Sequence, residues 1–319
     1  MSGTEWVAAA LLLDRLVGDP PGIWHPVAWM GHWIAWWERR LNRSNLSPVH
    51  LRGRGVALVA VTLLPFGGGA WLLLWGLHQM NPTFSGLASV LLIWTTVAWK
   101  GLGQAGRRVG RALTQEGLTA GRLAVAEIVG RDTGNMDEAE VVRATVETIA
   151  ENIVDAIVSP VFYACLGGPA AAIAYRVVNT LDAMVGHKSP RYRWFGWASA
   201  RLDDMLNWLP ARMTTLFLTL ALFFMRLNWR SAWSVLLRDA RKHPSPNSGI
   251  PEAMMAGGLG IRLGGRNFYN GVLSDRAFLG ENKHPLTVAD IDMAVKVLHV
   301  TTWILWLTVV GVAVLPQTL

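Results

Sequence analysis

Three long stretches of the chain are almost free of charge, and they constrain its fold more than any other feature. Val56 to Leu77 and Asn81 to Trp99 contain no charged residue, and Val297 to Leu315 contains only His299 as a titratable group. At 1.5 Å per residue, each stretch is close to the length of roughly 20 residues that a helix needs to cross the hydrocarbon. We therefore predict membrane spans at 56–77, 81–99 and 297–315.

The composition supports a membrane protein. Of the 319 residues, 52% are hydrophobic and only 16% are charged, whereas soluble domains carry roughly a quarter charged residues. The 17 tryptophans favour the headgroup level of a bilayer, where the ring is buried and the indole N–H stays wet. The net charge of +7 is compatible with nucleic-acid binding, but the basic residues flank apolar runs. We expect an all-α, polytopic membrane protein that binds the lipid bilayer and no nucleic acid.

Basic residues also predict the orientation of the first two spans. Five arginines lie between Arg39 and Arg54, and four basic residues lie between Lys100 and Arg111. The link at 78–85 has no arginine or lysine. Because cytoplasmic loops are enriched in these residues, the link is expected outside and both flanks in the cytoplasm of a cell inner membrane.

Shorter apolar stretches predict further elements. The stretch at 6–17 is interpreted as a retained first membrane element, since it lacks the basic start of a signal peptide. The stretch at 156–175 is broken by Gly167-Gly168-Pro169, which ends one helix and starts another, so we expect a re-entrant hairpin that enters from the cytoplasm. The stretch at 213–225 is either a span or a second hairpin.

Between these elements lie polar segments at about 100–155, 176–212 and 238–296, within a single domain of residues 1–319. Trp29, Trp33 and Trp36 recur at helical spacing before a charged patch. This pattern indicates an amphipathic helix in the membrane interface, with a core helix stripe as the alternative.

The first candidate site residues lie near the N-terminus. Asp14 is in an apolar element, and an intramembrane charge is expensive unless it is paired or faces a polar cavity. Asp19 in Gly-Asp-Pro and His25 in His-Pro are either functional or turn-forming residues.

A second group follows Arg131 and Asp132. Glu147, Glu151 and Asp155 stand at i, i+4 and i+8, so they project from one helix face, with Asn152 beside them. A solvated acidic face is the usual interpretation of such a row. Here the helix runs into the membrane, which favours a Mg²⁺ or substrate site.

A third group lies on the far side of the predicted hairpin. Asn179 and Asp182 share a helix face and are expected to meet the acidic row in one polar pocket. Lys188 follows, and then a charged helix carries Asp203 and Asp204. Carboxylates and amides are ligands for Mg²⁺ with phosphate rather than for zinc. Two arginines complete the group: Arg201 and Arg212.

The last group contains Ser245, Asn247 and Glu252, followed by a glycine-rich run with Arg262. Glycines let the backbone approach an anion, and an arginine supplies a fork for phosphate. Tight helix packing also uses glycine, and the run lacks the Gly-Lys-Ser/Thr ending of a Walker A loop. Gly-x-Ser-x-Gly and His-Glu-x-x-His motifs are absent, and Cys165 in an apolar run is a poor nucleophile.

These strings of residues, in this order, resemble the CbiB/CobD family of cobalamin biosynthesis. The resemblance runs nearly end to end and is carried by the following strings: Asp14 with Gly18-Asp19-Pro20 and His25-Pro26, Val129 to Thr133, Glu147 to Asn152 with Asp155, Asn179 to Asp182 with Met184 to Gly186, Ser199 to Arg201 with Asp203-Asp204, Leu209 to Arg212, and Ser245 to Asn247 with Glu252, Gly257 and Gly260. Departures are confined to loops and apolar runs.

The resemblance implies a membrane-bound ligase that forms an amide. It would join a carboxylate of the corrinoid adenosylcobyric acid to (R)-1-aminopropan-2-ol or its O-phosphate, with ATP as co-substrate and Mg²⁺, to give adenosylcobinamide or its phosphate. Phosphorylating a carboxylate creates a leaving group that an amine displaces, which needs cations around phosphate and a base near the amine.

On this hypothesis, one set of acids would share catalysis: Glu147, Glu151, Asp155, Asp182, Asp203 and Asp204. Glu151, Asp155, Asp203 and Asp204 would also hold Mg²⁺. The remaining candidates would bind substrate or phosphate. No tightly bound cofactor is expected, and other membrane enzymes of late cobamide assembly are expected as partners. The alternative is a membrane transporter or sensor of a phosphorylated or corrinoid solute, which would place its polar residues near the midplane of long spans.

Overall fold

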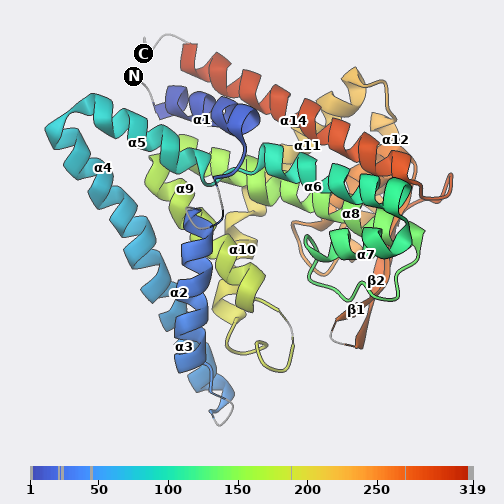
Figure 1. The fold of residues 1–319 in the computed structure, drawn as a ribbon, viewed down its shortest axis with the longest axis horizontal. Helices are drawn as coiled ribbons and strands as arrows, with labels where there is room; N and C mark the ends of the chain where they lie inside the picture. Colours follow the sequence, from blue (N-terminus) through green and yellow to red (C-terminus); the bar gives the residue numbers. More distant parts are fainter. Residues whose placement is uncertain are drawn as a thin grey trace. The chain divides into compact units, whose positions relative to one another are not determined.

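The computed structural model describes residues 3–20, 22, 25–43, 46–187, 189–269 and 271–314. The described chain is helical apart from one two-stranded sheet, which confirms the predicted helical class (Figure 1). It forms two compact units that alternate along the sequence. The first comprises Met1–Ala98, Ser159–Asn207 and Thr308–Leu319, and the second comprises Trp99–Val158 and Trp208–Leu307.

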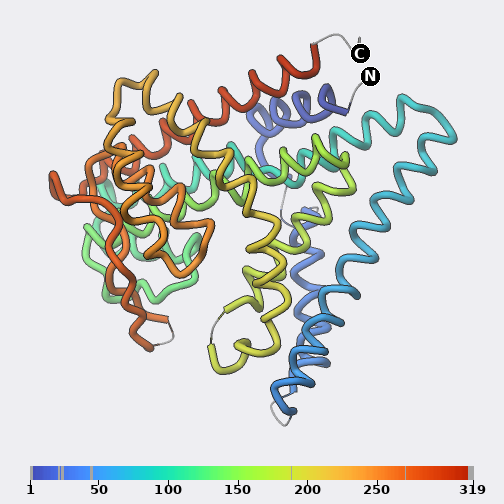
Figure 2. The backbone as a smooth tube through the Cα atoms, turned by 180° about the vertical axis from the view of Figure 1, so that it is seen from behind, coloured from blue at the N-terminus to red at the C-terminus, as the bar shows by residue number. Residues whose placement is uncertain are grey.

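The first unit is built from seven complete helices among its described residues. They are α1 (Gly3–Val17), α2 (Pro26–Leu41), α3 (Pro48–Leu63), α4 (Gly69–Met80), α5 (Pro82–Trp94), α9 (Ser159–Val185) and α10 (Trp197–Leu206). A π-helical turn, Leu64–Gly68, joins α3 to α4. Figure 2 shows the sharp reversal between α4 and α5, where the Asn81 side chain caps α5 by accepting a hydrogen bond from the Thr83 N–H at 2.8 Å.

Helix α9 is the centre of the first unit. It packs against α1, α2, α3, α4, α5 and α10. Ile173, Val177 and Leu181 recur at helical spacing and meet Ile34 of α2 and Leu58 of α3 in one buried cluster. Because lipid is as apolar as these side chains, close packing of the stripe, rather than its removal from water, is the main favourable term that assembles the helices.

The predicted break at Gly167-Gly168-Pro169 is confirmed. Gly167 and Gly168 have non-helical backbone angles inside α9, and Gly168 has φ 71° and ψ −167°. The rings of Tyr163 and Tyr175, one on each arm, stack with centroids 5.2 Å apart. Residues twelve apart in a straight helix would be separated by about 18 Å, so the two arms fold back on each other as a hairpin.

We expect Gly168→Ala to destabilise the protein by about 1–3 kcal/mol, because its backbone angles belong to a region that almost only glycine adopts. A methyl group there would meet no atom within 4 Å, so the loss comes from the backbone alone. Thermal unfolding in detergent measures it. Gly76→Ala, in helix α4 with equally open space, is the control; equal midpoints for the two variants would contradict the prediction.

The second predicted span differs from the structure at its end. Helix α5 stops at Trp94, five residues before the predicted boundary. The hydroxyls of Thr95 and Thr96 donate to the carbonyls of Leu92 and Ile93 at 2.8 and 2.7 Å. Such local bonds compete with the helical ladder, and they explain why an apolar, charge-free sequence leaves the helix here.

The second unit contains the remaining elements. They are α6 (Trp99–Arg111), α7 (Leu118–Ala126), α8 (Glu138–Ile153), α11 (Trp208–Phe224), α12 (Trp229–Asp239), α13 (Gly249–Leu259), β1 (Arg262–Tyr269), β2 (Val272–Gly280) and the greater part of α14 (Val288–Val314). Helix α13 lies at the centre of this unit and packs against α8, α11, α12 and both strands.

The antiparallel pair β1–β2 was not predicted. Its register pairs Arg262 with Gly280 and Tyr269 with Val272, with an irregularity between Leu263 and Gly265. The glycine-rich run divides into two parts. Gly257 and Gly258 lie in α13, where a Cβ atom would clash with Ala232 of α12 and Leu222 of α11, so they form the expected helix contact, whereas Gly264 and Gly265 belong to β1. Gly260 ends α13 in the left-handed conformation, as helices commonly end.

Four helical stretches in the described chain are long and apolar enough to cross a membrane. They are Pro48–Met80, Pro82–Glu116, Glu138–Val185 and Val288–Val314. Three of them contain the predicted spans, apart from Leu315 and one residue at the start of the second, and the other contains the hairpin. Large apolar side chains such as Leu72, Leu87 and Leu307 are exposed on these helices, as expected where lipid covers the surface. The protein is an integral membrane protein.

The shorter predicted elements are also helical. The stretch 6–17 lies in α1, and 213–225 lies mostly in α11, which ends at Phe224. Trp29, Trp33 and Trp36 are exposed on one side of α2. This exposure favours the amphipathic interface helix over a core stripe.

Candidate functional site

Glu147, on α8, is enclosed by positive groups within the second unit. Its carboxylate accepts a hydrogen bond from Arg131 at 2.6 Å and from the backbone N–H of Gly264 at 2.8 Å. Arg143, one turn earlier on the helix, lies 3.7 Å away. The side chain is only 4% exposed. A buried carboxylate of this kind needs these partners to remain charged.

The same arginines attach strand β1 to helix α8. Arg143 donates to the carbonyls of Gly264 and Arg266, and Arg131 donates to the Asn267 side chain. Burial lowers the pKa of Arg131, but the charge and hydrogen bond of Glu147 outweigh it and raise that pKa. The Arg131 guanidinium therefore stays charged, and together with Glu147 it holds the strand on the helix.

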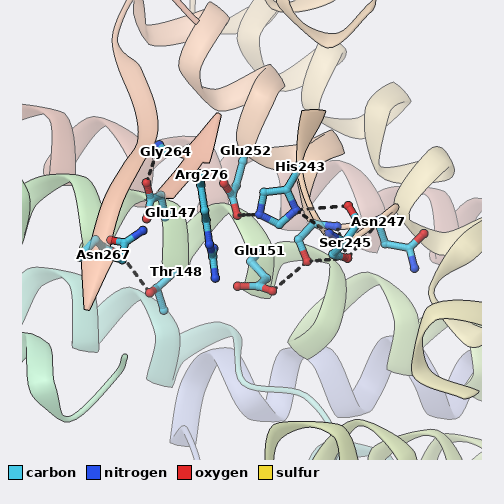
Figure 3. A network of polar contacts seen from close by, with 12 residues as sticks. Glu147, Thr148, Glu151, His243, Ser245, Asn247, Glu252, Gly264, Asn267 and Arg276 are labelled. Carbon is cyan, nitrogen blue, oxygen red and sulfur yellow. Dashed lines mark hydrogen bonds and ion pairs between the residues drawn. The ribbon is translucent and has the colours of Figure 1, made fainter. Parts of the chain in front are cut away.

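Glu151 lies one turn further along α8 and has a different partner. It accepts a hydrogen bond from the Ser248 hydroxyl at 2.8 Å. That hydroxyl also lies 3.2 Å from the hydroxyl of Ser245, and the Ser245 oxygen accepts from the N–H of Asn247 at 3.3 Å. These hydrogen bonds fix the loop before α13, so that its serines face Glu151 on α8 (Figure 3).

His243 and Glu252 form a buried pair beside this loop. The Nδ1 atom of His243 lies 3.1 Å from the Ser245 nitrogen and 3.2 Å from the Ser245 carbonyl oxygen, so its partner depends on the tautomer of the ring. The Nε2 atom lies 3.6 Å from Glu252 Oε1, and the two side chains are 7% and 3% exposed. Figure 3 shows the ring between Glu252 and the serine loop.

Burial shifts both members of this pair towards their neutral forms. Burial and the charges of Glu147 and Glu151 raise the pKa of Glu252 well above its ordinary value. Burial also lowers the pKa of His243, against the neighbouring carboxylates. Acids and bases shifted towards neutrality are typical of groups that take or give protons in catalysis.

We expect Glu252→Gln to reduce the pH dependence of stability. A carboxyl with a raised folded-state pKa contributes stability that is full below its unfolded value and is lost as pH rises through the folded value. Wild-type protein should therefore lose stability as pH rises above about 4.5, and glutamine, which has no proton to lose, should weaken this trend. Denaturant unfolding in detergent between pH 5 and pH 8 measures it. Identical slopes for both proteins would contradict a neutral Glu252.

Other predicted residues of the second unit lie around this cluster. Arg212 donates to the Trp208 carbonyl at 2.6 Å and to the Asn247 side chain at 3.4 Å. Asp132 accepts from the N–H of Gly271 at 2.7 Å, so it holds the turn of the β-hairpin. Asp155 lies in a π-helical turn, Val154–Val158, so the helical spacing of the acidic row ends after Glu151. Such turns occur frequently at functional sites.

The first unit has a polar cluster of its own. Asp203 accepts from Asn207 at 2.9 Å and from Asn179 at 3.4 Å. The Asn207 oxygen accepts from the hydroxyls of Ser159 at 2.6 Å and Tyr175 at 2.9 Å. The cluster joins α10 to both arms of the α9 hairpin.

Arg176 of α9 connects this cluster to the N-terminal residues. It donates to Asn179 at 3.1 Å, and its charge acts on both Asp19 and His25. Burial raises the pKa of Asp19 and lowers that of His25. Asp14 is fully buried in α1, and His25 caps α2 by accepting from the Val27 N–H at 3.2 Å. His25 of the His-Pro string is thus a helix cap, which is the structural alternative given above.

Comparison with known proteins matches almost the whole chain to one family. The model of the family described as CobD/Cbib protein covers residues 7–298. The chain is 41% identical to the cobalamin biosynthesis protein CobD of Halalkalibacterium halodurans over 296 residues, 92% of each chain. It is 44% identical to CobD of Geobacter metallireducens over 280 residues, 88% of this chain and 87% of the relative. It is 40% identical to CbiB of Salmonella typhimurium over 298 residues, 92% of each. The chain belongs to the CobD/CbiB family. No solved structure matches it.

In this CobD/CbiB protein, the predicted site residues fall in both units. The second unit contains Arg131, Asp132, Glu147, Glu151, Asn152, Asp155, Arg212, Ser245, Asn247, Glu252 and Arg262. The first contains Asp14, Asp19, His25, Asn179, Asp182, Arg201, Asp203 and Asp204. Lys188 lies outside the described residues. A common pocket for the two sets remains a prediction.

Several polar residues of the CobD/CbiB clusters were not assigned to the site from the sequence. Asn207, with the same oxygen-ligand chemistry as Asp203 and Asp204 beside it, and His243 lie inside the segments that the sequence singled out. Arg143 stands one turn before Glu147, a spacing that favours ion pairing on a helix. Arg276 reaches the site from β2, where it donates to Tyr269 at 2.8 Å. Nothing in the sequence indicated that Arg276 belongs to the site, because the β-hairpin that carries it was not predicted.

A metal site is not preformed in the part of the CobD/CbiB chain that the structure describes. No three His, Cys, Asp or Glu side chains converge there. Mg²⁺ is commonly held by one or two carboxylates together with substrate phosphates. Glu151 and Asp155 in one unit, and Asp203 and Asp204 in the other, are carboxylates of this kind.

Proposed function

We propose that the protein is a biosynthetic ligase that forms an amide in cobalamin biosynthesis. It joins a carboxylate of adenosylcobyric acid, a corrinoid, to (R)-1-aminopropan-2-ol or its O-phosphate at the expense of ATP. The product is adenosylcobinamide or its phosphate. Membership of the CobD/CbiB family over residues 7–298 is the observation that carries this proposal.

The reaction needs a group that accepts a proton. A carboxylate is a poor acyl donor until phosphoryl transfer gives it a leaving group, and the attacking amine must lose a proton as the amide forms. Glu151 and the His243–Glu252 pair lie together on α8 and at the start of α13, joined through Ser248 and Ser245. The Glu151 carboxylate and the neutral His243 ring accept and pass on the proton of the amine, and the protonated Glu252 keeps the ring in place.

The reaction also needs cations around crowded phosphates. Glu151, Asp155, Asp203 and Asp204 are the oxygen ligands assigned to Mg²⁺, which offsets phosphate charge when it is bound. Arg131 forms a buried ion pair with Glu147. Its role is therefore to stabilise the site rather than to bind phosphate. Arg201 and Arg262 are exposed and are assigned to phosphate or to the corrinoid.

The proposed location is the cell inner membrane, with the polar segments on the cytoplasmic side, where ATP is found. The distribution of basic residues supports this orientation. Other membrane enzymes of late cobamide assembly are the proposed partners. A cysteine scan tests the orientation: Ser245→Cys should react with a membrane-impermeant thiol reagent only in inside-out vesicles.

Purified protein in detergent, supplied with adenosylcobyric acid, aminopropanol or its phosphate, ATP and Mg²⁺, tests the activity. We expect one amide product for each ATP consumed. Absence of both product and ATP turnover would contradict the ligase. Uptake of a corrinoid by vesicles without product would support the transporter instead.

A further inference from the structure

The second unit has a pocket that none of the residues of the Glu151–His243–Glu252 cluster lines. It has a volume of ≈ 640 Å³ and lies between the start of α8 and the β-hairpin. Its walls include Arg262, Arg266, Asp275 and Phe278 from the hairpin, and Asp137 and Glu140 from the first turn of α8. The pocket therefore combines a strongly charged wall with an aromatic ring.

Two of its arginines are free to bind a ligand. Arg262 and Arg266 are exposed, and no salt bridge within the described residues involves either of them. The guanidinium of Arg262 lies 4.2 Å from the centre of the Phe278 ring, which holds it in one orientation. An arginine fork that is already oriented loses little entropy when it binds phosphate.

The wall between these arginines is bare backbone. Gly264 and Gly265 both have positive φ, 83° and 86°. A Cβ atom at Gly264 would lie 2.3 Å from the Ala277 carbonyl oxygen, and one at Gly265 would lie 2.6 Å from the Phe278 ring. Only glycine fits at these positions, because Ala277 and Phe278 already fill the space that a side chain would need. The glycines therefore shape the wall, and the two arginines are its groups for binding phosphate.

Acidic groups complete the lining. Asp137 and Glu140 form a capping box at the start of α8, in which each accepts one backbone N–H. Asp275 faces Arg266 in the register of the two strands. The acids of this wall are therefore engaged with the backbone or opposite Arg266, and the Mg²⁺ ligands remain those assigned above.

We propose that this pocket binds the triphosphate of a nucleoside triphosphate, with Arg262 and Arg266 on the phosphates. The proposal rests on the ligase function and locates its energy-supplying substrate. Its volume lies within the range of roughly 300–1,000 Å³ that suits ligands of nucleotide size. A corrinoid is considerably larger than a nucleotide, and the unphosphorylated amino alcohol has no anionic group for the arginines. The phosphate of the amino alcohol is the competing ligand, which the KM measurements below distinguish from ATP.

The test measures nucleotide binding and turnover in the same preparations of full-length protein in detergent. Binding of a non-hydrolysable ATP analogue is measured by equilibrium dialysis with Mg²⁺ and without the other substrates. The variant is Arg262→Gln/Arg266→Gln. The control is Arg108→Gln/Arg230→Gln, which removes the same charge from exposed residues of the same unit. Leu286→Trp fills the pocket without changing charge.

We expect the double variant to bind the analogue at least about tenfold more weakly, since one lost charged hydrogen bond corresponds to that factor. The KM for ATP should rise with it, whereas the KM values for corrinoid and amine should not. Leu286→Trp should act in the same direction and the control should resemble wild type.

Unchanged analogue binding in both pocket variants would overturn the proposal, and so would a rise in the KM for the aminopropanol phosphate alone. The proposed function is judged separately. If wild type forms amide and the pocket variants keep their KM for ATP, the pocket is wrong and the ligase stands. If wild type forms no amide but binds the analogue through Arg262 and Arg266, the pocket stands and the ligase fails.

Discussion

A Glu151→Gln variant is expected to lose amide-forming turnover by a factor of at least about 100, the scale of a positioned acid or base. Glutamine has the same shape as glutamate, and its oxygen can still accept the hydrogen bond that Ser248 donates at 2.8 Å. It cannot take a proton from the amine or contribute negative charge to Mg²⁺. The protein should therefore fold and insert normally while the reaction stops. Asp155→Asn should behave in the same way.

The rate at saturating substrates measures this effect, and membrane insertion is followed by fractionation. Glu138→Gln is the matched control, since Glu138 belongs to the same helix but is exposed in its first turn. Full activity of Glu151→Gln would remove this carboxylate from the catalytic site. The His243–Glu252 pair would then be left as the proton acceptor.

Glu147→Gln is expected to have its main effect on stability, with a loss of about 3–5 kcal/mol. Only one turn separates Glu147 from Glu151, yet its carboxylate is enclosed by Arg131, Arg143 and the N–H of Gly264. Removal of its charge leaves two buried guanidinium groups without compensation. Because these same arginines attach strand β1 to α8, the docking of the strand is weakened.

Denaturant unfolding in detergent measures this loss, with Glu151→Gln as the comparison of equal chemistry on the same helix. Glu147→Gln should unfold at lower denaturant, and Glu151→Gln should resemble wild type. If Glu147→Gln keeps wild-type stability but loses turnover, its carboxylate acts in the reaction, as the sequence first suggested.

Hydropathy predicted much of the fold, because the absence of charge over about 20 residues has few explanations other than a membrane span. It could not predict element ends that depend on side-chain bonds, as at Thr95 and Thr96. The β-hairpin was hidden for a related reason. A short pair of strands with glycines and charges has no clear alternation, and its position depends on distant contacts with Arg131 and Arg143.

The site could be predicted as a set of residues but not as a geometry. The spacing of Glu147, Glu151 and Asp155 suggested three equivalent acids on one face. The structure gives them three different environments: a buried ion-pair network, a serine loop and a π-helical turn. Sequence spacing shows which side chains share a helix face, but some of their partners come from elements over 90 residues away, such as Ser248 for Glu151 and Gly264 for Glu147.

The contact between Glu147 and Gly264 also has a consequence during synthesis. The two residues are 117 positions apart, so at bacterial and eukaryotic rates the ribosome needs about 6 to 23 seconds to make the second after the first. During this interval the Glu147 carboxylate lacks the hydrogen bond from the Gly264 N–H. It must stay hydrated or pair with Arg131 and Arg143 alone. Helix α8 can therefore reach its final buried state only after the hairpin has emerged, which makes late docking of β1 a step in the biogenesis of the protein.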